Sequence, residues 1–299
     1  MANAELIEKR SGLGEFRVPG EYYKDFFLLK DGETYHLFYN VGKADDCSQQ
    51  WHLPGNEKCF GHATSTDLRS WEIHPRILPV VPATWESQVV SAPCVFRHAN
   101  QWQMLYTGFD DQLTEWLGLA SSADLFQWQR HEENPVYSGP SWTAWREGVW
   151  ADCRDPHVIH HDGVFLMYTC VLHGNGRGAV ALARSHDLLE WEDLGAVLQT
   201  DPVPESPNVF EHSCKWYLIT SAGGAGAFMA NSPYGPWEPI PMQLPVDWYA
   251  WEILHETHTG KEGYVIGAFY WQLNGNFIRF WELDFEGYLP VIRDRYPAQ

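Results

Sequence analysis

The sequence repeats one nine-residue pattern three times, Ala-x-Ser-x-Asp-Leu-x-x-Trp. The copies end at Trp71, Trp128 and Trp191, and a shorter echo, Ala-Asn-Ser-Pro-Tyr-Gly-Pro-Trp, ends at Trp237. Tryptophans that recur every ~45–65 residues indicate a repeat architecture, in which each repeat is one supersecondary unit. This spacing constrains the fold more than any other feature of the chain, because a ring of repeats can bring distant residues to one opening.

Five strand–turn–strand patterns lie along the chain, and in each the second strand is rich in aromatic and aliphatic residues. The turns span residues 30–34, 98–101, 160–163, 211–215 and 259–263. Apolar runs separated by short polar or glycine-containing turns predict β-hairpins. With an Ala/Ser-rich strand after most hairpins, they predict five blades of about four strands each, an all-β five-bladed β-propeller. We find no linker or low-complexity stretch, so a single domain over residues 1–299 is expected.

The repeated pattern itself has an expected structural role. Ser and Asp side chains close tight turns by accepting hydrogen bonds from nearby backbone N–H groups. Tryptophan at the end of each copy is expected to pack between blades. Asp67, Asp124 and Asp187 are therefore not placed in an active site.

Composition narrows the possible partners. The chain of 299 residues carries 39 acidic and 20 basic residues, a net charge of −19, which argues against a nucleic-acid partner. It has neither an apolar stretch long enough to cross a membrane nor a signal-peptide h-region, so we expect no membrane partner and a cytoplasmic location, or a secreted one if a leader peptide has been removed. Its six cysteines form no Cys-x-x-Cys pair, so neither a zinc ribbon nor a redox pair is suggested. The hydrolysis considered below requires no cofactor. The oligomeric state is left open.

Acidic residues recur at the start of the first strand of the hairpins. Aligned on their hairpins, the five starting positions are Asp25, Ser91, Asp155, Glu205 and, less clearly, Glu252. Innermost strands of a propeller run side by side along the axis, so these positions are expected to converge on one end of the channel. Carboxylates brought together there repel one another and raise one another's pKa, an arrangement typical of chemistry rather than packing.

Converging carboxyl groups suit hydrolysis of a glycosidic bond. That reaction needs one protonated acid for the leaving oxygen and one carboxylate as base or nucleophile. Asp155-Pro156 and Glu205-Ser-Pro207 also place rigid backbone beside two of the acids. Glu205 has the longest side chain of the three, which suits a laterally placed general acid.

Several segments resemble the five-bladed glycoside hydrolases of families 32, 43 and 68, which include β-fructosidases, levansucrases, arabinofuranosidases and β-xylosidases. The resemblance rests on Tyr35-His-Leu-Phe-Tyr-Asn40, residues 61–71, Tyr106-Thr-Gly108, Arg154-Asp-Pro156 and Glu205-Ser-Pro207. It implies that Asp25 is the nucleophile or base, Asp155 the orienting carboxylate and Glu205 the general acid, acting on a furanoside or pentoside. Lys24-Asp25-Phe26 departs from the Asn-Asp-Pro-Asn string of family 32, and retention and inversion stay open.

Further residues are candidates for binding the sugar. Arg154 could hold sugar hydroxyls in a bidentate manner, or could form a structural ion pair. The other substrate-binding candidates are Trp51, Trp85, Trp251, Asp110 and Glu252. No metal site is predicted, because His157, His160 and His161 do not all share one face of a strand. His255 is a weak candidate for an axial ion, since some family 43 members hold one near the axis.

Three other functions compete with hydrolysis. A sialidase-type propeller would explain Ser65-x-Asp67 and Trp71, but the usual glycine between Asp and Trp is absent from all three copies. A non-catalytic sugar-binding propeller would use the same cavity without turnover. Glycosyl transfer or phosphorolysis would use the same carboxylates with a different acceptor.

Overall fold

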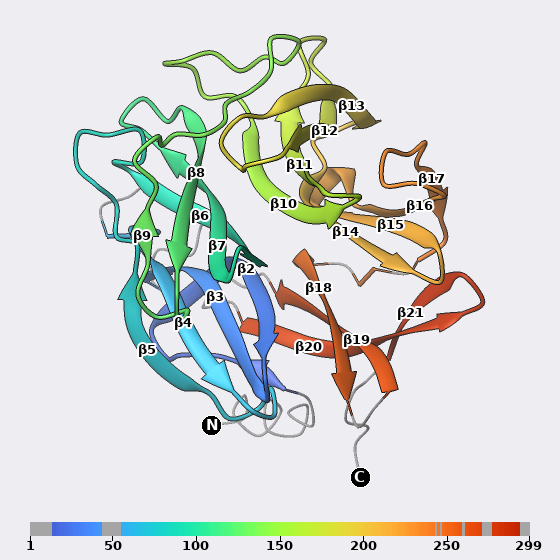
Figure 1. The fold of residues 1–299 in the computed structure, drawn as a ribbon. Coiled ribbons are helices and arrows are strands. Elements are labelled where there is room, and N and C mark those ends of the chain that lie inside the picture. Colours follow the sequence, from blue (N-terminus) through green and yellow to red (C-terminus); the bar gives the residue numbers. More distant parts are fainter. Residues whose placement is uncertain are drawn as a thin grey trace.

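The structure is a computed structural model, and it describes residues 14–43, 55–242, 244–245, 247–258, 261–270 and 277–293. They form five antiparallel sheets arranged as the blades of a β-propeller (Figure 1). The predicted all-β, five-bladed fold is therefore confirmed. The part of the chain that the structure describes holds no helix that could span a lipid bilayer.

The first four blades each contain four strands in chain order, running outward from the axis. Blade 1 is β2 (Glu21–Asp31), β3 (Thr34–Lys43), β4 (Phe60–Ser65) and β5 (Glu72–Ile77); blade 2 is β6 (Val89–His98), β7 (Gln101–Phe109), β8 (Glu115–Ser122) and β9 (Gln129–Arg130); blade 3 is β10 (Cys153–His161), β11 (Val164–Leu172), β12 (Gly178–Ser185) and β13 (Glu192–Thr200); blade 4 is β14 (Glu205–His212), β15 (Lys215–Ser221), β16 (Gly226–Ala230) and β17 (Glu238–Ile240). A 3₁₀ turn, η2 (Ala222–Gly224), links β15 and β16.

Blade 5 is closed by both ends of the described chain. Its strands β18 (Trp248–His258), β19 (Lys261–Tyr270) and β20 (Phe277–Glu286) follow one another, and β20 pairs with both β1 (Glu15–Phe16) and β21 (Leu289–Arg293). In the β1 pairing, Glu15 lies opposite Arg279 and Phe16 opposite Ile278. The N-terminal strand therefore ties the ring closed, a feature that the sequence analysis did not predict.

The hydrophobic core is divided into wedges between neighbouring blades. One cluster joins blades 5 and 1 around Tyr39 and Phe280, and similar clusters join each next pair of blades around the ring. The four repeat tryptophans, Trp71, Trp128, Trp191 and Trp237, each belong to a different wedge. The prediction that they pack between blades is confirmed.

The repeated Ser and Asp residues close turns, as predicted. In the first copy, Asp67 Oδ1 accepts hydrogen bonds from the N–H groups of Arg69 and Ser70 at 2.8 Å, and Ser65 Oγ accepts one from Leu68 at 2.9 Å. The copies around Asp124 and Asp187 repeat this pattern. These hydrogen bonds to the ionised form lower the pKa of all three aspartates.

The five inner strands, β2, β6, β10, β14 and β18, contact one another in a closed ring, and each has a shift in register at the same end. The residues left out of the pairing are Asp25 in β2, Ala92-Pro93 in β6, Asp155-Pro156 in β10, Ser206-Pro207 in β14 and Ala250-Trp251 in β18. Such bulges bend a strand and redirect a side chain. Here they bring five backbone segments to the axial opening.

Candidate active site

A cavity of about 580 Å³ opens at this end of the axis, and its lining combines charged and aromatic side chains. The charged residues are Lys24, Asp25, Glu57, Glu115, Arg154 and Glu205, and the aromatic ones are Phe109, Trp150, Tyr249 and Phe269. A second cavity of about 40 Å³ shares Asp25, Ser206 and Ala250 with it, and Asp155 lines this second cavity. The predicted convergence of Asp25, Asp155 and Glu205 on one region is therefore present.

Asp25 lies at the bulge of β2, in the lining of both cavities. Its Oδ2 accepts a hydrogen bond from Asn40 Nδ2 at 3.2 Å, and Asn40 Oδ1 accepts one from the N–H of Ala92 in the next blade. Burial, together with the nearby Asp155 and Glu57 carboxylates, raises the pKa of Asp25 well above its usual value. The backbone of blade 2 thus fixes the position of this carboxylate through Asn40.

Asp155 is buried, with only 7% of its surface exposed, and it joins three blades. Its N–H donates to Thr107 Oγ1 at 3.1 Å in blade 2, and its Oδ2 accepts a hydrogen bond from the N–H of Ser206 at 2.9 Å in blade 4. Burial raises its pKa to about 6 against the opposing effect of Arg154. Asp155 also has a φ of +57°, a backbone conformation that few non-glycine residues adopt and that occurs at functional sites.

Glu205 is held at the mouth of the cavity by Arg154. Its side chain is 40% exposed, and its Oε1 lies 2.9 Å from Arg154 Nη2. Arg154 also pairs with Glu115, whose Oε1 lies 3.2 Å from Nη1, and with Asp152, and its Nε lies 3.9 Å from Asp155 Oδ2. One guanidinium group therefore organises four carboxylates, so Arg154 lines the cavity and also forms the ion pairs that the sequence left as the alternative.

The positive φ angles correct the predicted alignment of the inner strands. Ala92, Asp155, Ser206 and Ala250 all have φ near +50° at the start of their bulges, so they are structural equivalents. Glu205 precedes this position by one residue and Glu252 follows it by two. The expectation that Asp155, Glu205 and Glu252 occupy one equivalent position is therefore wrong, because the bulge shifts the register. The shift places Glu205 at the rim and Glu252 deeper in the channel.

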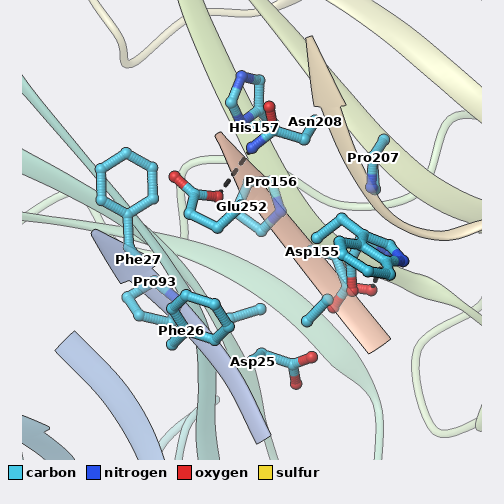
Figure 2. A pocket seen from close by; sticks show the side chains of 14 residues that line it. Asp25, Phe26, Phe27, Pro93, Asp155, Pro156, His157, Pro207, Asn208 and Glu252 are labelled. Carbon is cyan, nitrogen blue, oxygen red and sulfur yellow. Dashed lines mark hydrogen bonds between the residues drawn. The ribbon is translucent and has the colours of Figure 1, made fainter. Parts of the chain in front are cut away.

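Trp251 and Glu252 line the small axial cavity rather than the large one. Glu252 is buried, and its Oε2 accepts a hydrogen bond from Asn208 Nδ2 at 2.8 Å. Figure 2 shows this pair beyond Asp25 and Asp155 along the small cavity. Burial raises the pKa of Glu252 well above its usual value. These two sugar-binding candidates therefore lie in the small cavity beyond Asp25 and Asp155, and not in the large cavity.

Three other candidates lie elsewhere. Trp85 packs on Gly108 and Gly118 of blade 2, where a Cβ at either glycine would overlap its ring, and it is outside the lining of both cavities. Asp110 caps a turn, because its Oδ1 accepts hydrogen bonds from the N–H groups of Gln112 and Thr114 at 2.9 Å. His255 is exposed and stacks on Tyr264, and the described residues contain no cluster of three or more His, Cys, Asp or Glu side chains that could hold a metal ion. Trp51 lies outside the described residues.

The structure adds residues that the sequence analysis missed. Glu57 is buried beside Asp25, pairs with Lys24 Nζ at 3.2 Å and accepts a hydrogen bond from Tyr22 Oη at 3.0 Å. Glu115 begins the third strand of blade 2, and burial raises its pKa to about 7. Trp150 lies at the end of the connection between blades 2 and 3. None of the three occupies a repeated position, so no pattern in the sequence marked them.

The raised pKa of Asp155 predicts that its charge destabilises the fold near neutral pH. A carboxyl group with a folded pKa above its unfolded one costs stability as pH rises between the two values, here from 3.8 to about 6. The difference in free energy of unfolding between the Asp155→Asn variant and wild type is therefore expected to grow, in favour of the variant, by about 3 kcal/mol as pH rises from about 4 to about 7. The Asn side chain can still accept the hydrogen bond from Ser206.

Urea titrations of both proteins across this pH range measure the difference. The comparison with wild type is needed because burial lowers the pKa of His36 to about 4 and of His62 to about 3, and that effect makes stability rise with pH. Both proteins contain these histidines, so their contribution cancels. A stability difference that does not change with pH would contradict the raised pKa.

The geometry defines a five-bladed propeller with a cluster of carboxylates at its axial opening. Residues 27–283 match the model of the glycosyl hydrolases family 32 N-terminal domain, and the chain belongs to that family. The match begins two residues after Asp25 and includes Asp155 and Glu205.

The individual relatives share about 30% of the aligned residues with this chain and are longer than it. A probable sucrose-6-phosphate hydrolase of Psychromonas ingrahamii is 28% identical over 176 residues, which cover 55% of this chain and 28% of the relative. A sucrose:sucrose 1-fructosyltransferase of Festuca arundinacea is 32% identical over 213 residues, 67% of this chain and 30% of that protein. The chain thus aligns with less than a third of the length of these relatives.

Solved structures agree on the fold. A family 32 β-fructofuranosidase of Bombyx mori in complex with sucrose has a TM-score of 0.72 at 19% identity, over 99% of this chain and 69% of that one. A thermostable family 43 glycoside hydrolase also has a TM-score of 0.72, at 18% identity, over 93% of this chain and 95% of that one. At these identities the likeness establishes the propeller fold.

Proposed function

We propose that the chain is a glycosidase that cleaves a β-fructofuranoside. The observation that carries this proposal is the placement of three carboxyl groups from different blades around one opening, with Asp25 and Asp155 deep and Glu205 at the rim. Family 32 membership favours a fructosyl unit over the arabinosyl or xylosyl units that the sequence left open.

Each carboxyl group has a role that fits its surroundings. Asp25, fixed by Asn40, attacks the anomeric carbon or activates a water molecule for the attack. Asp155 accepts hydrogen bonds from sugar hydroxyls, which strengthen as the ring takes on oxocarbenium character. Glu205, whose side chain is 40% exposed, donates its proton to the glycosidic oxygen of the leaving group.

Fructosyl transfer is the second candidate, because one relative of this chain is a sucrose:sucrose 1-fructosyltransferase. Transfer and hydrolysis share the first chemical step and differ in the acceptor, a sugar hydroxyl or water. Products from concentrated sucrose separate the two, since transfer yields trisaccharides and hydrolysis yields only glucose and fructose.

The proposal predicts turnover on a substrate panel of sucrose, 1-kestose, and nitrophenyl β-fructofuranoside, α-arabinofuranoside and β-xyloside. We expect kcat/KM on the fructosides to exceed that on the pentosides by at least ~10²-fold, because a site built to hydrogen-bond particular hydroxyls rejects sugars that leave them unpaired. Released sugar is measured by chromatography, and NMR of the first-formed anomer assigns retention or inversion. A preference for either pentoside would contradict the proposal, and absence of turnover on every fructoside would favour a sugar-binding propeller.

A further inference from the structure

A long connection between blades 2 and 3, residues 131–152, reaches the mouth of the cavity. It is fixed against the start of β8: Trp145 Nε1 donates to the carbonyl oxygen of Glu115 at 2.7 Å, and the N–H of Gly148 donates to Thr114 Oγ1 at 2.9 Å. The Trp145 ring also packs edge-on against Trp116, with ring centroids 4.8 Å apart. Connections of this length in compact domains are usually either functional or disordered. This one is held in place by specific contacts.

The connection presents Trp150 at the opening. Trp150 is 60% exposed, the largest exposed fraction among the large hydrophobic side chains of the described residues, and it lines the large cavity. Its Nε1 donates to Glu115 Oε1 at 3.3 Å, and Glu115 is itself buried. An exposed indole that is fixed at one edge offers a flat apolar face without further ordering cost. Such a face suits the C–H surface of a sugar ring.

Trp150 lies on the side of the cavity where the leaving group must sit. Glu115 contacts both Trp150 and Arg154, and Arg154 contacts Glu205, so Glu115 and Arg154 connect the indole to the general acid in turn. The groups proposed to act on the fructosyl ring, Asp25 and Asp155, line the small inner cavity. A substrate whose fructosyl unit fills the deep end therefore places its leaving group beside Glu205 and Trp150.

The charges on this side disfavour an anionic leaving group. Glu115, Asp152 and Glu205 surround Arg154, which pairs with all three. Lys24, the other cation of the described lining, pairs with Glu57. A phosphate group here would face an excess of carboxylates, with both cations already paired. This bears on substrate class, because the phosphate of sucrose 6-phosphate is carried by the leaving glucose.

We propose that Trp150, positioned by Glu115, is the stacking platform for the sugar ring of the leaving group, and that the substrates are neutral oligosaccharides rather than sugar phosphates. This inference rests on the proposed fructosidase function, and it adds a specificity-determining residue and the class of leaving group. Trp150 contacts substrate, whereas Glu115 acts through Trp150 and Arg154 and is a positioning residue.

The first test compares a leaving group that has a ring with one that lacks it. Trp150→Ala is expected to lower kcat/KM on sucrose about tenfold or more relative to its effect on methyl β-fructofuranoside, whose leaving group has no ring to stack. Trp150→Phe is expected to restore most of the loss, because it restores an aromatic face. Val149 is an exposed neighbour in the same connection, so Val149→Ala is the matched control and should leave kcat/KM on both substrates unchanged. Equal losses on both substrates would overturn the platform.

The second test compares sucrose with sucrose 6-phosphate. Wild type is expected to favour sucrose in kcat/KM by about tenfold or more, a ratio that falls as ionic strength rises. Above pH 7, where Glu115 is ionised, Glu115→Gln removes one charge but keeps an acceptor for the Trp150 indole, so it should narrow the ratio several-fold. A wild-type preference for the phosphorylated sugar would overturn the assignment of neutral substrates.

Binding separates this inference from the proposed hydrolysis. Calorimetric titration of sucrose and of methyl β-fructofuranoside into the Asp25→Asn variant requires no turnover. Adding Trp150→Ala to that variant should weaken sucrose binding about tenfold or more relative to methyl β-fructofuranoside. If wild type shows no hydrolysis but this difference persists, the proposed activity fails and the platform stands. If hydrolysis occurs without the difference, the platform is wrong.

Discussion

Replacing Asp25 with Asn is expected to lower kcat on sucrose on the order of 10⁴-fold while the protein stays folded. The amide has the shape of the carboxylate but cannot attack the anomeric carbon or accept a proton from water. It can still accept the hydrogen bond from Asn40 Nδ2, so the link to the backbone of blade 2 is kept. The loss therefore reports chemistry and not misfolding.

The same variant is expected to be at least as stable as wild type at neutral pH. Asp25 is half-buried near Asp155 and Glu57, and these surroundings oppose its ionised form. A neutral amide removes that cost, so the melting temperature should stay equal or rise, whereas a purely structural carboxylate would lower it when replaced. Stability given up in exchange for function is common at active sites.

Initial rates with sucrose and thermal unfolding of the same preparations measure both effects. Asp124→Asn is the matched control, because Asp124 closes a surface turn that Asn can also close. It should leave kcat within about twofold of wild type. An Asp25→Asn enzyme that keeps more than about 1% of wild-type kcat would contradict the role of Asp25.

The propeller could be predicted from the sequence because each repeat forms a turn whose structure depends only on residues close in sequence. The turns around Asp67, Asp124 and Asp187 depend on side-chain hydrogen bonds within a few residues, and the tryptophans follow at a fixed distance. β1 escaped prediction because two residues, Glu15 and Phe16, carry no pattern of their own. Their pairing with β20 depends on closure of the whole ring.

The predicted convergence of the three carboxyl groups is present in the structure, the predicted alignment of their strands is wrong, and their catalytic roles stay a prediction. Asp25, Asp155 and Glu205 meet at one opening. However, each inner strand has a bulge that shifts its pairing register, and the residue types at the bulges do not reveal these shifts. The equivalent bulge residues are Ala92, Asp155, Ser206 and Ala250, which share a positive φ and no side-chain type. Glycine or asparagine would have marked such positions in the sequence. The tertiary contacts of the axis impose this backbone conformation instead.

The sequence analysis missed Glu57, Glu115 and Trp150 for a different reason. Glu57 precedes a strand, Glu115 begins a third strand, and Trp150 ends a connection between blades, so each reaches the cavity through long-range packing. Trp85 shows the converse. It resembles a sugar-stacking tryptophan in the sequence, but two glycines of blade 2 make room for it as a packing residue.

Replacing Glu205 with Gln is expected to have an effect that depends on the leaving group. On sucrose, whose leaving alkoxide needs a proton, kcat/KM should fall about 10²–10⁴-fold. On nitrophenyl β-fructofuranoside, whose leaving phenolate is far less basic, it should fall by about tenfold or less, since protonation contributes less to that transition state. A mainly structural Glu205 would produce equal losses on both substrates.

The position of Glu205 allows the difference between the two substrates to be attributed to catalysis rather than to folding. Its side chain is 40% exposed and its ion pair is with Arg154, which keeps Glu115 and Asp152 as partners when Glu205 is replaced. The variant should therefore unfold at nearly the wild-type temperature, and its catalytic defect can be assigned to the missing proton. Rates across a series of aryl fructosides give a Brønsted slope that is steeper in the variant than in wild type. Parallel slopes would assign the proton to another group and leave Glu205 as a ligand for Arg154.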